Sequence, residues 1–260
     1  MTQERVFLYG DEGDDDITGA DNLSAQYLWG GEGDDKIVGG DFTADTLFIN
    51  GNEGDDILYG GYGGVNETIQ GGKGDDKINV DPEQYYMDPA TQTMLLDPAT
   101  ITATARGMNT GNVVFRGGDG DDEIWANTSN THADGMTASK YYGGAGDDIL
   151  KGALAAPTGQ ILVGQGGRDT IDTAWLDGIK TDPPTTYGID QADLLIWGDY
   201  GYGTDGSFVV AEQYGDARLE EQIWGDDDII RIGKGGGAAM TSARVWAGDG
   251  DDEIDIASGW

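Results

Sequence analysis

The apolar residues of this chain recur at a fixed offset from glycine-rich segments. In eight nine-residue units, an Asp holds the sixth place and an Ile or Leu holds the eighth place. Another apolar residue lies two positions before each unit, as Leu8 lies before Gly10. Successive side chains of a strand face opposite sides, so each apolar residue predicts a short strand with one inward side chain. The inward residues predicted before these eight turns are Leu8, Leu28, Ile49, Ile69, Phe115, Tyr141, Leu162 and Val245. A degenerate turn at Gly198, which Ile196 precedes in the same way, and a shortened turn at Gly225 extend the series.

The spacing of the units predicts a solenoid. The first four begin at residues 10, 30, 51 and 71, so the period is 20 or 21 residues. Looser glycine segments lie between them, such as the one that begins at Gly39. We interpret one coil as a strict turn, a strand, a loosened turn and a second strand. Stacked coils predict an all-β fold, a parallel β-roll or β-helix solenoid of about ten coils.

The units read G-G-x-G-x-D-x-U-x, where U is a large aliphatic residue, and this composition favours calcium. Glycines at the first, second and fourth places permit positive φ, so the chain can curl with its carbonyls inward. The sixth-place Asp adds a carboxylate, and such hard oxygen ligands on a flexible loop suit Ca²⁺. Transition metals prefer His or Cys, but the chain has only His132 and no Cys.

The candidate calcium ligands are therefore turn residues, and the strict turns should line one edge of the solenoid. The opposite edge should bind less calcium, because its loosened turns often lack the sixth-place Asp. The candidates are Gly10, Glu12, Asp15, Gly30, Glu32, Gly33, Asp35, Gly51, Glu53, Asp56, Gly71, Lys73, Asp76, Gly117, Asp119, Asp122, Gly143, Ala145, Asp148, Gly164, Asp169, Asp227, Asp249 and Asp252.

These eight units closely resemble the repeats of the RTX, or haemolysin-type, calcium-binding β-roll family. The resemblance implies a parallel β-roll that holds several Ca²⁺ ions between successive coils. The family also attaches its rolls to metalloproteases, lipases and epimerases. The chain contains neither H-E-x-x-H nor G-x-S-x-G, and its non-repeat residues are too few for a separate domain of ordinary size. We therefore expect no enzyme activity, and a carbohydrate-active enzyme is the remote alternative.

Three stretches interrupt the pattern. We expect a single calcium-binding β-roll domain over residues 1–260, with loop insertions near 80–112, 172–192 and 201–220. Insertions in solenoids map to loops on one face, and they also form partner-binding surfaces. Aromatic residues beside the turns should face outward and either brace adjacent strands or meet a partner or a glycan. They are Tyr9, Trp29, Tyr142, Trp197, Trp224 and Trp246.

Charge excludes some partners. The 49 acidic and 14 basic side chains give a formal charge of −35, so we expect no nucleic-acid partner. The chain contains no apolar run long enough to cross a membrane, and its start shows no signal peptide. We also expect calcium to fold the chain, because charge repulsion along a thin rod opposes folding without it.

Two classes of function remain open. The first is an extracellular or cell-surface scaffold, adhesin, fibre or surface-layer subunit, because weak sites fill at high ambient calcium. The second is an intracellular binder, cytoplasmic or cytoskeletal, that resembles the protist calcium-binding acidic-repeat proteins and docks on a larger assembly of protein subunits. In either class, we expect the two ends of the solenoid to support end-to-end self-association.

Overall fold

The fold of the 260-residue chain is given by a computed structural model. The structure describes residues 4–41, 43–61, 66–80, 85–87, 94–96, 112–125, 139–152, 161–172, 194–197, 227–232, 243–248 and 250–256. These residues form strands and turns, and no helix that could span a membrane occurs in them.

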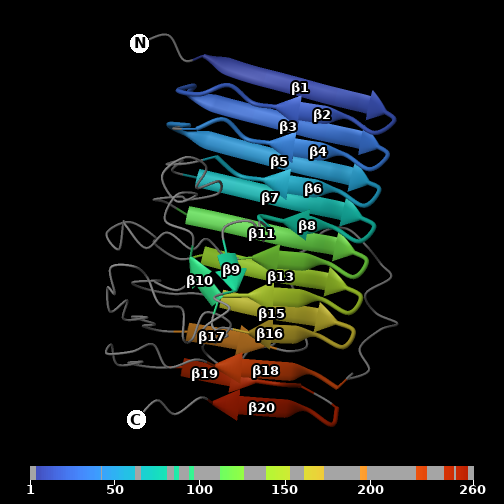
Figure 1. The fold of residues 1–260 in the computed structure, drawn as a ribbon, viewed down its shortest axis with the longest axis vertical. Coiled ribbons are helices and arrows are strands. Elements are labelled where there is room, and N and C mark those ends of the chain that lie inside the picture. Colours follow the sequence, from blue (N-terminus) through green and yellow to red (C-terminus); the bar gives the residue numbers. More distant parts are fainter. Residues whose placement is uncertain are drawn as a thin grey trace.

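Two parallel sheets of nine strands each form the body of the protein (Figure 1). The long-strand sheet contains β1 (Arg5–Glu12), β3 (Ala25–Glu32), β5 (Thr46–Glu53), β7 (Asn66–Lys73), β11 (Asn112–Asp119), β13 (Ser139–Ala145), β15 (Ile161–Gly166), β17 (Leu194–Trp197) and β19 (Ala243–Trp246). The short-strand sheet contains β2 (Asp16–Thr18), β4 (Lys36–Val38), β6 (Ile57–Tyr59), β8 (Lys77–Ile78), β12 (Glu123–Trp125), β14 (Ile149–Lys151), β16 (Thr170–Asp172), β18 (Ile229–Ile232) and β20 (Glu253–Ile256). The chain alternates between the sheets, so the predicted parallel β-roll is confirmed.

The core is a double column of mostly aliphatic side chains between the sheets, and Phe115 and Tyr141 are its aromatic members. Ile37 on β4 and Leu28 on β3 are fully buried, and each pairs in register with the equivalent residue of the next coil. The inward residues predicted from the sequence lie in the long-strand column, where Ile196 is placed by its register with Leu162 and Val245. A strand of three residues suffices in the short-strand sheet because only its middle side chain must reach the core.

The described sheets contain nine strands each, whereas the sequence suggested about ten coils. The expected number counts the degenerate glycine turns at Gly198 and Gly225 as two separate coils. β17 ends at Trp197 and β18 begins at Ile229, and the described residues hold no further strand of the two sheets between them. One coil therefore stands where the sequence suggested two.

The predicted insertions fall mostly outside the described residues. Within the first, β9 (Tyr85–Met87) pairs antiparallel with β10 (Met94–Leu96), which makes a small separate sheet. Residues 173–192 and 201–220, together with His132 and Trp224, are not among the described residues.

An aromatic ladder lies on the outer face of the long-strand sheet at its first coils. Tyr9 stacks on Trp29 with ring centroids 4.6 Å apart and planes 4° apart. Phe7 stacks on Tyr27 at 4.9 Å, and Phe48 lies beside Trp29 at 5.7 Å. Parallel strands in register place these rings over one another, so the ladder braces adjacent coils as one of the two interpretations predicted.

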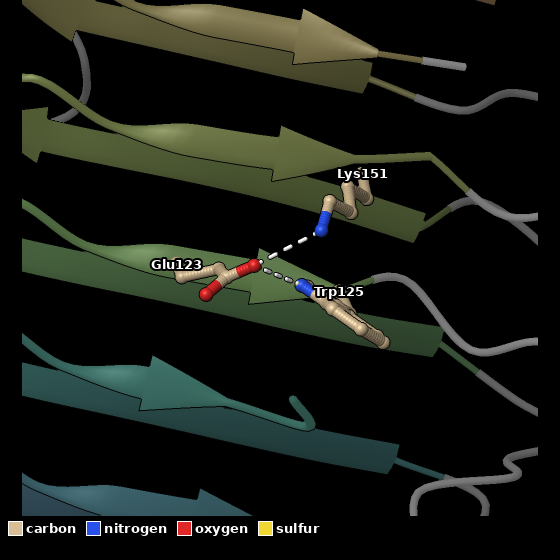
Figure 2. Close-up of polar contacts among 3 residues, drawn as sticks. All are labelled: Glu123, Trp125 and Lys151. Atoms are coloured by element: carbon tan, nitrogen blue, oxygen red, sulfur yellow. Dashed lines mark hydrogen bonds and ion pairs between the residues drawn. The ribbon is translucent and has the colours of Figure 1, made fainter. Parts of the chain in front are cut away.

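A three-residue clamp joins β12 to β14 on the outer face of the short-strand sheet (Figure 2). The Trp125 indole N–H donates to Oε1 of Glu123 at 2.6 Å, and Nζ of Lys151 lies 3.0 Å from the same oxygen. The Lys151 ammonium also lies 4.0 Å from the Trp125 ring centroid. These side-chain interactions join two adjacent coils. The clamp therefore adds to the stability that the backbone hydrogen bonds give the stack.

Candidate calcium-binding turns

The strict turns use glycine for two different reasons. At the second and fourth places the backbone has positive φ, for example 136° at Gly31 and 123° at Gly33. At the first place φ is not positive, so the conformational freedom predicted for that glycine is not used. A Cβ on Gly30 would instead overlap Oδ2 of Asp35 and lie 2.8 Å from the Gly51 carbonyl oxygen. The first glycine therefore clears a space for oxygen atoms.

The sixth-place aspartates form an aspartate column along one edge of the roll. The backbone N–H of each donates to Oδ1 of the aspartate in the next coil at 2.8–3.1 Å. Its members from Asp35 to Asp228 are at most 2% exposed. The column consists of Asp15, Asp35, Asp56, Asp76, Asp122, Asp148, Asp169, Asp228 and Asp252.

The second carboxylate oxygen, Oδ2, makes no hydrogen bond along most of the column. It is buried and has no hydrogen-bond partner in Asp15, Asp35, Asp56, Asp76, Asp122 and Asp148. Burial, followed by the charges of neighbouring aspartates, raises the pKa of Asp56 to about 7, Asp76 to about 8 and Asp148 to about 10. An unpaired buried oxygen costs free energy, and an isolated buried charge costs much more. The column therefore requires protons or cations close to Oδ2.

Backbone carbonyls supply further oxygen atoms in each gap between coils. The space beside Gly30 is bordered by Asp35 Oδ2 and the Gly51 carbonyl, and that beside Gly117 by Asp122 Oδ2 and the Gly143 carbonyl. Carbonyls of the second and fourth places, such as those of Asp11 and Gly54, point toward the glycine of the next coil. Carboxylate and carbonyl oxygens on an adaptable loop are the ligands that Ca²⁺ takes. The residues present therefore fit calcium.

Side chains alone would not complete such a site. Among the described residues, no three His, Cys, Asp or Glu side chains group closely enough to hold a metal. Each gap contains two column carboxylates, such as those of Asp35 and Asp56, so carbonyls must provide the remaining ligands. This explains why the turn has several glycines but only one buried carboxylate.

From Glu32 onward, the backbone carbonyls of the third-place candidates accept hydrogen bonds from the preceding coil. The side chains of Glu12, Glu32 and Glu53 are exposed, and the Glu32 carbonyl already accepts from the Gly13 N–H at 2.6 Å. Lys73 pairs with Glu53, and its ammonium cannot ligate a cation. Asp119 and Ala145 occupy the same register position in later coils, and their carbonyls accept in the same way.

At the eighth coil the predicted register is shifted by one residue. Asp228, not Asp227, belongs to the aspartate column: it is 1% exposed, and its Oδ1 accepts from the Asp169 N–H at 2.8 Å. Asp227 is exposed and occupies the fifth place. The sequence Gly225-Asp-Asp-Asp offered three equivalent carboxylates, and only pairing with β16 and β20 selects among them. Asp249 lies outside the described residues.

The fifth-place aspartates form a second, exposed row that the sequence did not predict. Oδ1 of Asp34 accepts from the Asp55 N–H at 2.9 Å, and Oδ1 of Asp55 accepts from the Asp75 N–H at 2.9 Å. These bonds run from each coil to the preceding one, opposite to those of the aspartate column. Arg168 interrupts the row, and its Nε donates to the Asp227 carbonyl at 3.2 Å. The fifth place therefore helps to set the spacing of the coils.

The opposite edge uses side chains of a different kind, which the sequence analysis also missed. The buried Gln26 amide accepts from the N–H of Ala20 and Gly40 and donates to Oγ1 of Thr43 at 2.6 Å. Glu67 holds the same register position two coils later and accepts from the Gly61 N–H at 3.1 Å. Burial raises the pKa of Glu67 to about 8. The sequence did carry a signal for these residues. Gln26 and Glu67 are polar at a register position that is apolar in other coils, at Leu47 and Val113.

A stack of two parallel sheets with glycine turns and a buried aspartate column defines a parallel β-roll with calcium-type turns. The family model described as RTX calcium-binding nonapeptide repeat (4 copies) matches residues 4–22, 27–43, 48–64, 62–81, 109–130 and 141–154. The chain therefore carries RTX calcium-binding nonapeptide repeats and is a calcium-binding repeat protein. Comparison with curated proteins and with solved structures gave no match.

Proposed function

We propose that this protein is a calcium-folded rod that serves as a structural scaffold, fibre or surface-layer subunit outside the cell. One observation carries the proposal: a continuous column of buried carboxylates with unpaired Oδ2 atoms. A roll with such a column is poorly stable without cations, because it buries a row of carboxylates in a chain whose net charge is −35. Millimolar calcium outside cells would fill even weak sites.

We propose one ion for each gap between coils. Nine strands per sheet leave 9 − 1 = 8 gaps, and eight divalent ions change the charge from −35 to −19. The column carboxylates would be the charged ligands, and the carbonyls of the first, second and fourth places would complete the shell. The whole chain would then be one β-roll domain, with its insertions as loops.

The side chains of the opposite edge favour a lower calcium content on that edge. Where the strict turns present a charged carboxylate, Gln26 presents a neutral amide whose hydrogen bonds are made within the protein. A neutral side chain adds no charge that a divalent ion would balance. Calcium would therefore bind mainly along the edge of the aspartate column.

Circular dichroism and native mass spectrometry test this function. The chain is first stripped with chelator, and its β signal is then followed as Ca²⁺ or Mg²⁺ is added. We expect the β signal to rise with Ca²⁺ at far lower concentration than with Mg²⁺, and the folded species to carry about eight ions. A β spectrum that is equally strong after complete removal of calcium would contradict the proposal.

The aromatic ladder favours a second candidate, a binder that docks on a larger assembly. Phe7 is 52% exposed and Tyr9 is 61% exposed, and the acidic residues Asp11, Glu32 and Glu53 line the same surface pocket as Tyr9. A surface of this kind fits a partner that offers both apolar and basic groups. Calcium would have the same folding role in this candidate, and purification of the natural complex would distinguish the two.

A further inference from the structure

A surface pocket lies beside the aromatic ladder. Trp29 on β3 lines it, and Tyr9 stacks on the Trp29 ring with centroids 4.6 Å apart. In the next coil the register places Asn50, whose amide donates to Oδ1 of Asn52 at 2.6 Å, so the residue that follows Trp29 in its column is not aromatic. The pocket is lined by Tyr9, Asp11, Trp29, Glu32, Asn52 and Glu53, together with Gly30 and Gly31.

Most of this pocket belongs to internal strands. Trp29 and Glu32 lie on β3, and Asn52 and Glu53 lie on β5. Each of these strands is paired with a described strand on either side. These four residues therefore keep their neighbours whatever residues precede β1.

Two residues of the pocket occupy strained backbone positions. The second place of the turn has φ of 79° at Asp11 and 86° at Asn52, whereas the equivalent residue between them is Gly31. A residue with a side chain pays a strain at such φ that glycine avoids. The strain sets a carboxylate and an amide at the pocket, which are hydrogen-bonding groups that glycine could not supply.

The acidic residues at the pocket lie close to one another in the register. Glu12, Glu32 and Glu53 stand side by side at the third place of successive coils, and like charges in this arrangement repel. Lys73 pairs with Glu53, but no described basic side chain pairs with Glu12 or Glu32. Among the described residues, no three acidic side chains lie close enough to share one metal ion. A larger, organic cation therefore fits these carboxylates better than a metal ion.

The protein holds basic side chains on aromatic rings at two other places. Nζ of Lys151 lies 4.0 Å from the Trp125 ring centroid and 3.0 Å from Oε1 of Glu123 (Figure 2). The Arg116 guanidinium lies 5.6 Å from the ring centroid of Tyr142, in the same outer column of the long-strand sheet as the ladder. A ring with a cation on it is thus a contact that this sheet surface already forms.

Trp29 and Glu32 offer the same combination of ring and carboxylate, but no basic side chain among the described residues lies on the Trp29 ring. We propose that this pocket binds an arginine side chain of a partner protein, which stacks its guanidinium on Trp29 and pairs it with the Glu32 carboxylate. Arginine fits better than lysine because its planar guanidinium is weakly hydrated, stacks on aromatic faces and pairs with carboxylates through two hydrogen bonds. The inference specifies the partner chemistry of the docking candidate and rests on that candidate, not on the number of calcium ions.

Three glycine-based pentapeptides with capped ends test the ligand class. Their central residue is arginine, lysine or citrulline, and citrulline has nearly the shape of arginine without its charge. In heteronuclear NMR of the calcium-loaded chain at about 0.15 M salt, the arginine peptide should shift the backbone amide signals of Gly31 and Glu32 saturably. The lysine peptide should bind more weakly, and the citrulline peptide should cause no shift. Equal affinity for arginine and lysine, or no shift with arginine, would overturn the inference.

Two matched pairs of variants locate the site. Trp29→Leu removes a pocket ring, whereas Tyr27→Leu removes a ladder ring that does not line the pocket, so affinity should fall about threefold to tenfold in the first only. Glu32→Gln removes a pocket carboxylate, and Glu253→Gln removes an exposed one on the short-strand sheet. Both glutamine variants lose one negative charge, and only Glu32→Gln should weaken binding clearly. Equal weakening would mean that the peptide responds to the net charge of −35 alone, which would overturn the inference.

A neutral sugar tests the other occupant that an aromatic surface suits. Shifts of the Gly31 and Glu32 amides with cellotetraose but not with the arginine peptide would assign a glycan and overturn the arginine site. A natural partner that Trp29→Leu retains as well as the unmodified chain does would keep the docking candidate and overturn this inference.

Circular dichroism on the same samples separates the inference from the calcium-dependent function. Folding on Ca²⁺ without peptide binding would overturn the arginine site alone. Arginine binding by a chain whose β signal does not depend on Ca²⁺ would support the site and overturn the calcium-folded rod.

Discussion

The backbone N–H of Asp35 donates to Oδ1 of Asp56 at 2.8 Å. This bond fixes one oxygen of the buried carboxylate and leaves the other unpaired. The same relation repeats along the column, so from Asp35 to Asp148 each carboxylate has one oxygen held by a backbone N–H and one oxygen available to a cation. Folding and ion binding therefore depend on the same side chains, which is the situation in which metal binding contributes directly to folding free energy.

Asp56→Asn should remove one calcium site, and Asp55→Asn should not. The amide introduced by Asp56→Asn could still accept from the Asp35 N–H, but it would lack the charge beside the cation. Asp55 is exposed, and its substitution would weaken one hydrogen bond from the Asp75 N–H. Isothermal titration calorimetry should show one or two fewer ions and lower cooperativity for Asp56→Asn, with near-normal binding for Asp55→Asn. Equal losses would mean that the fifth-place carboxylate is also a ligand.

Ile37→Ala should destabilise the calcium-bound protein by about 2–5 kcal/mol, because it leaves a cavity in a fully buried column. The control is Ile57→Ala on the neighbouring strand, where the side chain faces outward and is 37% exposed. We expect that substitution to cost less than about 1 kcal/mol. Urea unfolding at saturating Ca²⁺ measures both. A similar cost at the two positions would contradict the inward and outward assignment.

The nine-residue pattern predicted most of the fold because each unit contains the residues that determine its own turn and strand. Each unit has its own glycines, its carboxylate and one core residue such as Ile37, and the same unit repeats with parallel pairing. Stacking therefore follows once the period is known. The inward residues and the buried sixth-place aspartates could be predicted for the same reason.

The remaining features depend on contacts between coils and could not be predicted from one unit alone. The choice of Asp228 over Asp227 depends on pairing with coils that lie 59 and 24 residues away in the sequence. The buried role of Gln26 likewise depends on Gly40 and Thr43 of the next half-turn. The first-place glycine is required because a Cβ on Gly30 would overlap the Asp35 carboxylate. The position of that carboxylate cannot be read from the spacing of residues in the sequence.

Gly30→Ala should abolish binding of the calcium ion between the second and third coils. The new Cβ would occupy the space beside Asp35 Oδ2 and the Gly51 carbonyl, so the carboxylate must move. Gly13→Ala is the control: no atom lies within 4 Å of its Cβ position, but φ there is +105°, so it adds about 1–3 kcal/mol of backbone strain without blocking a site. Native mass spectrometry should count fewer ions in the first variant only. A full complement of ions in Gly30→Ala would show that the space is not part of a site.

Glu67→Gln should make the calcium-loaded protein less sensitive to alkaline pH. Burial raises the pKa of Glu67 from an ordinary 4.5 to about 8, so the folded state keeps a proton that the unfolded state releases between these values. The stability that this proton contributes is complete below pH 4.5 and is lost as the pH rises through 8. Gln cannot titrate and can still accept from the Gly61 N–H. We expect the thermal midpoint of the unmodified chain to fall below that of Glu67→Gln at about pH 9, with a smaller difference at about pH 6. Gln26→Ala, on the same edge but without a titrating group, should lower the midpoint equally at both pH values, and a pH-independent effect of Glu67→Gln would contradict the buried-acid explanation.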